Sequence, residues 1–264
     1  MSTQPARAGV IIIGSNSTRM LTADLDAGLS RPVFGRMDTR LFMALGQGKR
    51  LSVEAIQTAC RDVAALYAMA REGGADRTLL MATSAVRESE NGKSLAYALL
   101  QATGLSLQVI TGDEEAAYSF WGAVHPFPRQ EMAGVMDIGG GSTEIALGHP
   151  GDAPFTHSLP LGAARLYAMQ PIASADDAGK ALQAAGKIAR EGTRAMAHKA
   201  LTQPPRLWAD PARWLLVGGT GTALMGLLKA QLYHRGQPDA PFGRDDVLDI
   251  LRRLASLKVW WMPS

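Results

Sequence analysis

The sequence lacks several features that are typical of secreted or membrane proteins. Cys60 is the only cysteine in 264 residues, so no disulfide can form within one chain. The helix-like pattern around Cys60 favours a buried structural thiol over a nucleophile. The apolar run from Val10 to Ile13 has four residues, whereas a secretory signal needs about 7–15 and a membrane-spanning helix ~20. We therefore expect a cytoplasmic protein with no membrane partner.

The sequence also lacks a strongly charged segment and any familiar metal or triad pattern. Its net charge is only +3, spread along the chain, which argues against a nucleic-acid partner but is compatible with an anionic substrate. The histidines have no metal-ligand spacing, and no Ser/His/Asp arrangement is visible. Hydrophobic residues make up 47% of the chain, enough for substantial cores, so a folded protein is expected rather than a disordered one.

An internal repeat links the two halves of the chain. Residues 10–19 read V-I-I-I-G-S-N-S-T-R and residues 135–144 read V-M-D-I-G-G-G-S-T-E, at an offset of 125. Each copy is an apolar strand, a turn of small residues and a second strand. Such turns expose consecutive backbone N–H groups that can bind phosphate oxygens. Two ordinary hairpins are the alternative, but one copy in each half favours a cleft between related lobes.

The remaining pattern predicts an α/β sheet in each half. Further strands are expected at residues 32–40, 78–83, 105–110 and 214–217, and helices at 52–71, 91–103, 113–123, 178–201, 222–230 and 244–257. Ser52 is the expected cap of the first helix, and Gly73 and Gly74 should end it. Two prolines interrupt both patterns within residues 125–129, which places the boundary between a first lobe, residues 1–125, and a second lobe, residues 126–264.

Removal of a phosphoryl group needs donors for its oxygens, a cation and a base for the attacking water. Three small-residue turns are candidate phosphate sites. Their candidate ligands are Ser15, Asn16 and Ser17 in the first turn, Gly140, Gly141, Ser142 and Thr143 in the second, and Gly219 and Thr220 in a third turn between a strand and a helix. A lone turn of this kind is a weak signal, but together they predict a ring of phosphate-binding loops.

Two carboxylates flank the second turn. Asp137 and Glu144 lie on the strands that enter and leave it, so in a tight hairpin both could hold a hydrated Mg²⁺. The alternatives are that Asp137 caps the turn and that Glu144 is an exposed strand residue. The metal-ligand hypothesis is stronger for Asp137, because this residue interrupts an apolar strand.

Two further segments carry charged side chains where a strand gives way to a helix. Arg87 follows the strand at 78–83 and could clamp a phosphate, although a surface salt bridge to Glu88 or Glu90 fits equally well. Asp113, Glu114 and Glu115 open a helix, where acids most often stabilise the helix dipole. One of them could be the general base, and spacing does not distinguish Glu114 from Glu115.

The combination of motifs resembles the exopolyphosphatase / guanosine pentaphosphate phosphohydrolase (Ppx/GppA) family, in the superfamily of actin-like ATPase folds. The matching segments are I-G-S-N-S, A-T-S-A-V-R, V-I-T-G-D-E-E-A, M-D-I-G-G-G-S-T-E, S-L-P-L-G-A-A-R-L and V-G-G-T-G-T, which occur in family order from Val10 to about Leu228. The resemblance implies two actin-like, ribonuclease H-like lobes with an interdomain cleft. It also implies a hydrolase that releases terminal phosphate from polyphosphate or from a (p)ppGpp-type nucleotide.

The resemblance also implies roles for particular residues. Glu115 corresponds to the general base, Arg87 to the arginine that grips the phosphate chain, and Asp137 and Glu144 to the carboxylates that hold Mg²⁺ or its waters. Residues 15–17 and 140–143 correspond to the two phosphate cradles. Arg165, in the S-L-P-L-G-A-A-R-L segment, corresponds to a position near the cleft without an assigned role.

Two departures from the family pattern keep other functions open. Ile12 stands where the family has an aspartate, in the position that Asp137 occupies in the second copy. After Leu257 the chain ends within seven residues, which predicts a second lobe truncated at its C-terminus, with a sheet edge that Trp260 and Trp261 could cover in a homodimer. A catalytically weak polyphosphate or nucleotide sensor is therefore the first alternative, and an actin-like kinase the second.

Overall fold

The computed structural model of the chain describes residues 7–25, 29–46, 48–202, 213–234, 245–247 and 249. The chain divides into two compact units between Glu115 and Ala116, ten residues before the predicted boundary. The division falls inside helix α4 (Gly112–Val124), because Glu115 pairs with Arg87 of the first unit while Phe120 belongs to the core of the second. The two units are described separately.

The first unit is built on a five-stranded mixed sheet, in the order β3-β2-β1-β4-β5. Its strands are β1 (Arg7–Ile13), β2 (Thr18–Asp24), β3 (Ser30–Met37), β4 (Arg77–Ala82) and β5 (Leu107–Val109). β1, β2 and β3 form an antiparallel meander, and β4 and β5 continue the sheet in parallel with β1. The predicted third strand, residues 32–40, ends three residues early, and the predicted strand at 105–110 is shorter than expected.

The helices of the first unit are α1 (Val53–Glu72), α2 (Ser84–Arg87) and α3 (Gly92–Thr103), with a short 3-10 turn η1 (Met43–Leu45). The predicted cap of α1 is confirmed, because the Ser52 side chain accepts a hydrogen bond from the amide of Ala55. The helix ends at Gly73, as predicted. Gly104 ends α3 in the left-handed conformation, which glycine adopts without steric cost.

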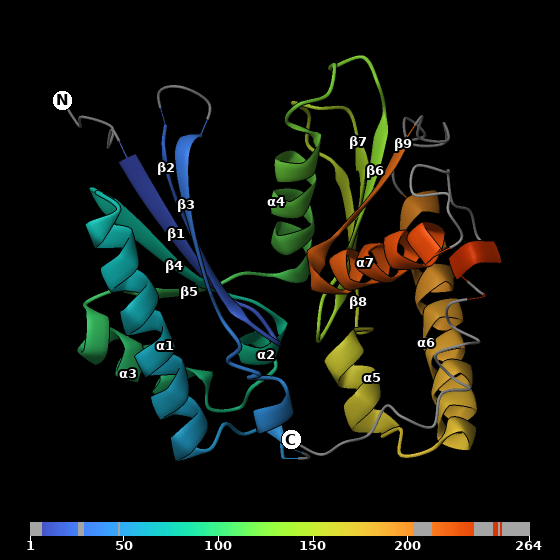
Figure 1. Cartoon of the computed structure of the whole chain (residues 1–264), viewed down its shortest axis with the longest axis horizontal. Coiled ribbons are helices and arrows are strands. Elements are labelled where there is room, and N and C mark those ends of the chain that lie inside the picture. Colours follow the sequence, from blue (N-terminus) through green and yellow to red (C-terminus); the bar gives the residue numbers. More distant parts are fainter. Residues whose placement is uncertain are drawn as a thin grey trace. The chain divides into compact units, whose positions relative to one another are not determined.

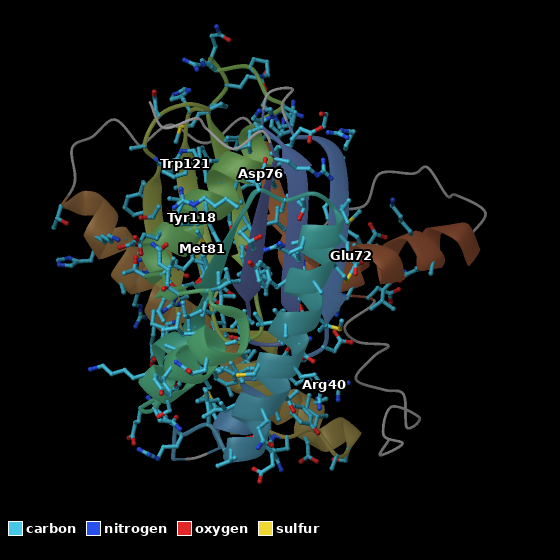
Figure 2. All side chains as sticks on the ribbon, turned by 90° about the vertical axis from the view of Figure 1, so that its left-hand side faces the viewer. Arg40, Glu72, Asp76, Met81, Tyr118 and Trp121 are labelled. Carbon is cyan, nitrogen blue, oxygen red and sulfur yellow. The ribbon has the colours of Figure 1, made fainter. Side chains whose placement is uncertain are left out.

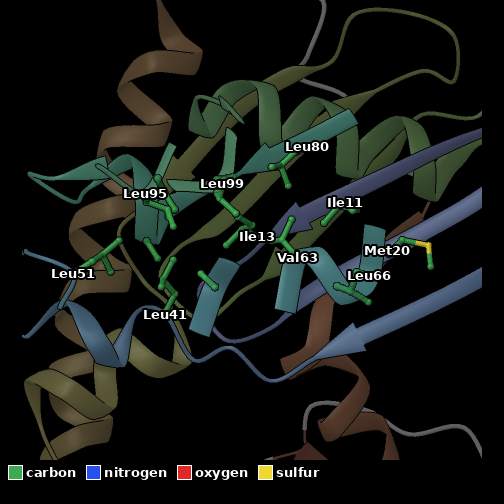
Figure 3. Close-up of a cluster of buried hydrophobic side chains, with 14 of the residues drawn as sticks. Ile11, Ile13, Met20, Leu41, Leu51, Val63, Leu66, Leu80, Leu95 and Leu99 are labelled. Atoms are coloured by element: carbon green, nitrogen blue, oxygen red, sulfur yellow. The ribbon is translucent and has the colours of Figure 1, made fainter. Parts of the chain in front are cut away.

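The core of the first unit lies between its sheet and helices α1 and α3 (Figures 1 and 3). Ile11 and Ile13 alternate inward along β1 and are fully buried, whereas Ile12 between them is 38% exposed on the other face. Val63 and Leu66 of α1 meet them from the helix side. Each fully buried side chain of this kind contributes about 1.5–3 kcal/mol, so this alternation fixes the strand register and the position of the turn that follows β1.

The second unit has a four-stranded sheet in the order β8-β7-β6-β9. Its strands are β6 (Ala133–Ile138), β7 (Thr143–Gly148), β8 (Phe155–Leu159) and β9 (Arg213–Val217), and its helices after α4 are α5 (Ala163–Met169), α6 (Ala175–Leu201) and α7 (Gly218–His234). β6, β7 and β8 again form an antiparallel meander, with β9 parallel to β6. β8 and α5 were not predicted, whereas the long helix and the strand before Gly218 were.

Helix α4 covers one face of the second sheet (Figure 1). Ala116, Phe120 and Val124 of α4 pack on Val135 of β6 and Ala146 of β7. Tyr118 and Trp121 lie on the exposed side of the same helix with their rings in edge-to-face contact (Figure 2). The apolar face of α4 therefore fixes this helix on the same side of the sheet that bears the odd-numbered residues of β6.

An ion-pair cluster centred on the buried Asp24 lies at the end of the first sheet where β1 begins. Arg7 Nη1 donates to Asp24 Oδ1 at 2.7 Å, Arg31 binds both oxygens of Asp24, and the amide of Arg7 donates to Asp76. Asp76 and Arg40 lie at opposite ends of this unit (Figure 2). The hydrogen bond from Arg31, and next the one from Arg7, lower the pKa of Asp24 from 3.8 to about 2.

Replacement of Asp24 by asparagine should lower the melting temperature by several degrees at neutral pH. Because folding depresses the pKa of Asp24, its stabilisation is complete above about pH 4 and is lost as the pH falls toward 2. Thermal melts of the two proteins between pH 7 and 2 should therefore converge at the acid end. Asp38→Asn is the matched control, since Asp38 pairs with Arg36 at the exposed surface. A constant difference at all pH values would contradict the assignment.

Several sequence expectations concern residues beyond the described ones. The predicted helix at 244–257 falls largely outside them, and Trp260 and Trp261 lie wholly outside, so the homodimer expected from them stays a prediction. Among the described residues, no helix combines the length and the apolar character needed to cross a bilayer. Burial raises the pKa of the Cys60 thiol, in keeping with the structural role predicted for it.

Candidate functional site

The two copies of the sequence repeat fold into the same turn. In the first unit the amide of Gly14 donates to the carbonyl of Ser17 at 3.1 Å, and in the second the amide of Gly139 donates to Ser142 at 3.0 Å. The flanking strands pair in equivalent register, with Ile13 opposite Thr18 and Ile138 opposite Thr143. Both turns therefore connect two antiparallel strands through the same hydrogen bond and in the same register.

The second turn is held from behind by the start of α5. The carbonyls of Gly139 and Gly140 accept from the amides of Ala163 and Arg165, and the carbonyl of Gly141 accepts from Arg165 Nε at 2.7 Å. In a trans peptide the N–H group points away from the carbonyl of the same plane. The amides of residues 140–142 are therefore directed away from α5, in the arrangement that binds anions.

The first turn is held in the same way by the segment after β3. The carbonyls of Ser15 and Asn16 accept from the amides of Phe42 and Arg40, at 2.9 and 2.8 Å, so the amides of residues 16 and 17 point away from that segment. One holding residue obeys the offset of 125, because Arg40 corresponds to Arg165, whereas Phe42 and Ala163 do not correspond to each other. The two supports are therefore similar in kind but not identical in position.

The side chains of the turns are mostly engaged within the protein. The Ser15 hydroxyl is hydrogen-bonded to that of Ser84 at 2.7 Å, at the start of α2, and Ser17 accepts from Arg19 Nε at 3.3 Å. The Thr143 hydroxyl donates to the carbonyl of Leu161. These hydroxyls are engaged in holding the turns, so the backbone amides are better candidates for contacts with an anion than the side chains named from the sequence.

Asp137 and Glu144 face each other across the second hairpin. They are direct partners in the antiparallel pair of β6 and β7, so their side chains lie on the same face of the sheet. Asp137 is partly exposed, whereas Glu144 is only 2% exposed. Ser119 of α4 donates to Asp137 Oδ2 at 2.6 Å, and Ser158 of β8 donates to Glu144 Oε1 at 2.8 Å.

This pair of carboxylates fits the preferences of Mg²⁺. That ion is usually held by one or two carboxylates, with waters and phosphate oxygens completing its octahedron. In the described part of the chain there is no group of three or more His, Cys, Asp or Glu side chains that could hold a metal. A fully protein-ligated site of the zinc type is therefore not found among these residues.

The equivalent row of the first sheet has the opposite charge. Ile12 is the partner of Arg19 on β2, and Arg19 is in turn the partner of Arg36 on β3. These positions correspond to Asp137, Glu144 and Ser158 in the second sheet. An acid at position 12 would thus face the guanidinium of Arg19 and not a second carboxylate, and Arg36 is itself paired with Asp38.

Arg87 and Glu115 are brought together in the first unit. Arg87 Nη1 donates to Glu115 Oε2 at 3.1 Å and to the carbonyl of Ile110 at 2.8 Å, and the two side chains are 25% and 17% exposed. Both contacts use Nη1, and a guanidinium carries further N–H donors of the kind that bind phosphate. Arg87 is therefore not the surface salt bridge to Glu88 or Glu90 that the sequence left open.

The structure gives Glu114 and Glu115 different partners. Glu114 accepts hydrogen bonds from the amide and hydroxyl of Thr111, at 2.7 and 2.9 Å, while the amide of Glu114 donates to the same hydroxyl. This is a capping box at the start of α4. The amide of Thr111, and next its hydroxyl, lower the pKa of Glu114, which makes it a weaker base. Glu114 serves the helix, and Glu115 is the acid held beside an arginine.

The third turn expected from the sequence is helical in the structure. Gly218, Gly219 and Thr220 do not form a loop but are the first turn of α7, which follows β9 without a connection. Gly218 makes this possible with φ of +88°, a conformation that glycine adopts readily. A side chain at this position would collide with Asp137 Oδ1, so the start of α7 lies against the candidate metal ligand.

Each unit therefore assembles part of the predicted site. In the first, the turn at residues 14–17 is tied through Ser84 to the short helix that carries Arg87. In the second, the turn at residues 139–142, the acid pair and the start of α7 lie together. The sequence interpretation missed Ser119, Ser158 and Gly162. Gly162 packs closely against Gly140. The one feature of the sequence that could have indicated this is the glycine in the S-L-P-L-G-A-A-R-L segment.

The geometry and the fold define a protein of the actin-like class, with two α/β units that each bear one hairpin of the same kind. The model of the Ppx/GppA phosphatase family matches residues 25–231, and the chain belongs to that family. Among solved structures, an exopolyphosphatase from Cytophaga hutchinsonii has a TM-score of 0.74 at 19% identity, covering 95% of this chain and 80% of that one. The Aquifex aeolicus PPX-GPPA enzyme has a TM-score of 0.63 at 21% identity, with coverages of 92% and 75%.

Curated relatives match a shorter part of the chain at higher identity. Exopolyphosphatase 2 of Mycobacterium tuberculosis is 37% identical over 175 residues, which is 61% of this chain and 53% of that protein. An uncharacterized protein of Streptomyces coelicolor is 34% identical over 162 residues, 61% of this chain and 48% of its own length. The chain thus spans about half the length of the curated relatives it matches.

Proposed function

We propose that the protein is a Mg²⁺-dependent phosphohydrolase that releases terminal phosphate from inorganic polyphosphate. The observation that carries this proposal is the pair of equivalent turns, whose carbonyls are bound from behind so that consecutive amides are presented to an anion. A turn of this kind suits a phosphate group. The names of the relatives, among them exopolyphosphatases 1 and 2 of mycobacteria, agree with this substrate class.

The charged residues divide the chemistry among them. We assign Glu115 as the general base that takes a proton from the attacking water, with Arg87 holding it in place and contributing donors to phosphate oxygens. The carboxylates of Asp137 and Glu144 would hold Mg²⁺. When bound, this ion neutralises charge that develops on the phosphate oxygens. Arg19 adds positive charge to the first hairpin, where Ile12 provides no acid.

Guanosine pentaphosphate is the second candidate substrate, because its phosphoanhydride chain presents the same groups to the turns. A sensor that binds polyphosphate without cleaving it is the alternative that Ile12 favours, since the first hairpin then lacks one acid. These candidates differ in turnover and in base recognition, not in the anion-binding turns, so a single comparison of substrates separates them.

The test is phosphate release from long-chain polyphosphate and from guanosine pentaphosphate, with Mg²⁺ and with excess EDTA. We expect phosphate from polyphosphate with Mg²⁺, and a loss of at least about 100-fold with EDTA, because removal of the ion leaves the developing charge without its cation. Release from the nucleotide alone would reassign the substrate. Binding of polyphosphate without release would establish the sensor, and undiminished turnover in EDTA would refute the role of the metal.

A further inference from the structure

Both candidate metal ligands receive a hydrogen bond from a serine that lies outside the hairpin. Ser119 comes from α4 and reaches Asp137, and Ser158 comes from β8 and reaches Glu144, its direct strand partner. Neither serine belongs to the repeat or to a turn, and the first unit has Arg36 at the position equivalent to Ser158. The Ser158 donor is therefore specific to the half of the molecule that carries the acids.

The presence of a serine beside each carboxylate has a different alternative explanation in the two cases. Glu144 is almost completely buried, so a hydrogen-bond donor beside it is expected for stability alone. Asp137 is only partly buried and could be hydrated by water in the absence of any serine. The neighbouring positions of α4, Ala116 and Phe120, are apolar and packed in the core, whereas Ser119 is only partly buried.

Asp137 is confined at both of its oxygens. Oδ2 accepts from Ser119 at 2.6 Å, and Oδ1 lies against the start of α7, where only the missing side chain of Gly218 leaves it room. A carboxylate fixed in this way does not have to be ordered when a cation binds, which removes part of the entropic cost of binding.

We propose that Ser119 is a positioning residue that holds the Asp137 carboxylate in the orientation required by a divalent cation, with Ser158 as the corresponding partner of Glu144. This inference rests on the proposed function, because it deepens the metal site of that reaction. Ser119 does not touch the substrate in this scheme. It acts only through Asp137, so its effect should be on cation affinity first and on turnover second.

The test is the binding of Mn²⁺, used as a paramagnetic substitute for Mg²⁺, to the whole protein without substrate. Titrations followed by the EPR signal of the free ion would compare the wild type with Ser119→Ala, Ser119→Thr and Asp137→Asn. We expect Ser119→Ala to weaken Mn²⁺ about 10-fold, Ser119→Thr to restore the affinity because it keeps the hydroxyl, and Asp137→Asn to abolish binding. Ser94→Ala, at an exposed serine of α3, is the matched control and should bind as the wild type does.

The outcomes distinguish the positioning role from the proposed function. If Asp137→Asn abolishes Mn²⁺ binding while Ser119→Ala binds as the wild type does, the metal site stands and the positioning role is wrong. Tighter binding by Ser119→Ala would also overturn it, since the hydroxyl would then only reduce the basicity of the carboxylate. If the wild type binds no Mn²⁺, or Asp137→Asn binds it equally well, the metal site of the proposed function fails as well. The Mg²⁺ dependence of turnover should shift with the same pattern, while KM for polyphosphate at saturating Mg²⁺ stays unchanged.

Discussion

Replacement of Glu115 by glutamine should reduce kcat for phosphate release from polyphosphate by about 10²–10⁴-fold, the contribution typical of a general base. The amide keeps the size of the side chain and can still contact Arg87, but it cannot accept a proton from water. Polyphosphate affinity should change little, because the amides of the two turns do not depend on Glu115. Single-turnover phosphate release and equilibrium binding of polyphosphate would measure the two quantities separately.

Glu114→Gln provides the control for this prediction on the adjacent residue. Glu114 belongs to the capping box with Thr111, and glutamine keeps an oxygen that can accept from the Thr111 amide, so its replacement should weaken the start of α4 only slightly and leave kcat nearly unchanged. The reverse result, a dead Glu114→Gln with an active Glu115→Gln, would show that the base was assigned to the wrong acid. Loss of activity in both would indicate that the position of α4, and not the chemistry of one residue, controls turnover.

The parts of the fold that depend on residues close together in the sequence could be predicted from it. The Ser52 cap and the end of the first helix at Gly73 each depend on residues only a few positions apart in the chain, and the structure has both as predicted. β8 was missed because its five residues, Phe155–Leu159, show no sustained alternation. Strand β8 is stabilised by pairing with β7, which is a tertiary effect that the sequence of the segment does not reveal.

The site was predictable where the repeat pointed to it, and less so where a distant segment completes it. Sequence placed Asp137, Glu144 and the two turns, because the repeat sets them in equivalent places. It did not reveal that the Thr143 hydroxyl is bound to Leu161 or that Ser119 reaches Asp137, because these contacts depend on strand register and on how α4 rotates over the sheet. The roles assigned to these residues stay proposals, for which the substitutions above are the tests.

Replacement of Gly162 by alanine should disable the second turn. A Cβ atom at this position would overlap the carbonyl of Gly140 and the amide of Gly141, and backbone atoms cannot yield as the end of a flexible side chain can. We expect a cost in stability of about 1–3 kcal/mol, as for other overpacked sites, and a fall in kcat/KM for polyphosphate of about 100-fold, because the amides no longer point at the phosphate. Thermal melts and initial rates at low substrate would measure both.

Gly179→Ala is the matched control for this effect, because a Cβ on that residue of α6 would meet no heavy atom within 4 Å. It should keep full activity and be slightly more stable, since alanine favours a helix by about 1 kcal/mol over glycine. If Gly162→Ala does not fold, Arg165→Lys removes the Nε contact to the Gly141 carbonyl without adding volume, and it should lower kcat/KM in the same direction. Wild-type turnover in both Gly162→Ala and Arg165→Lys would mean that the geometry of this turn does not matter to the reaction. The anion-binding function would then have to reside in the first turn alone, where Arg19 lies opposite Ile12 instead of opposite a second acid.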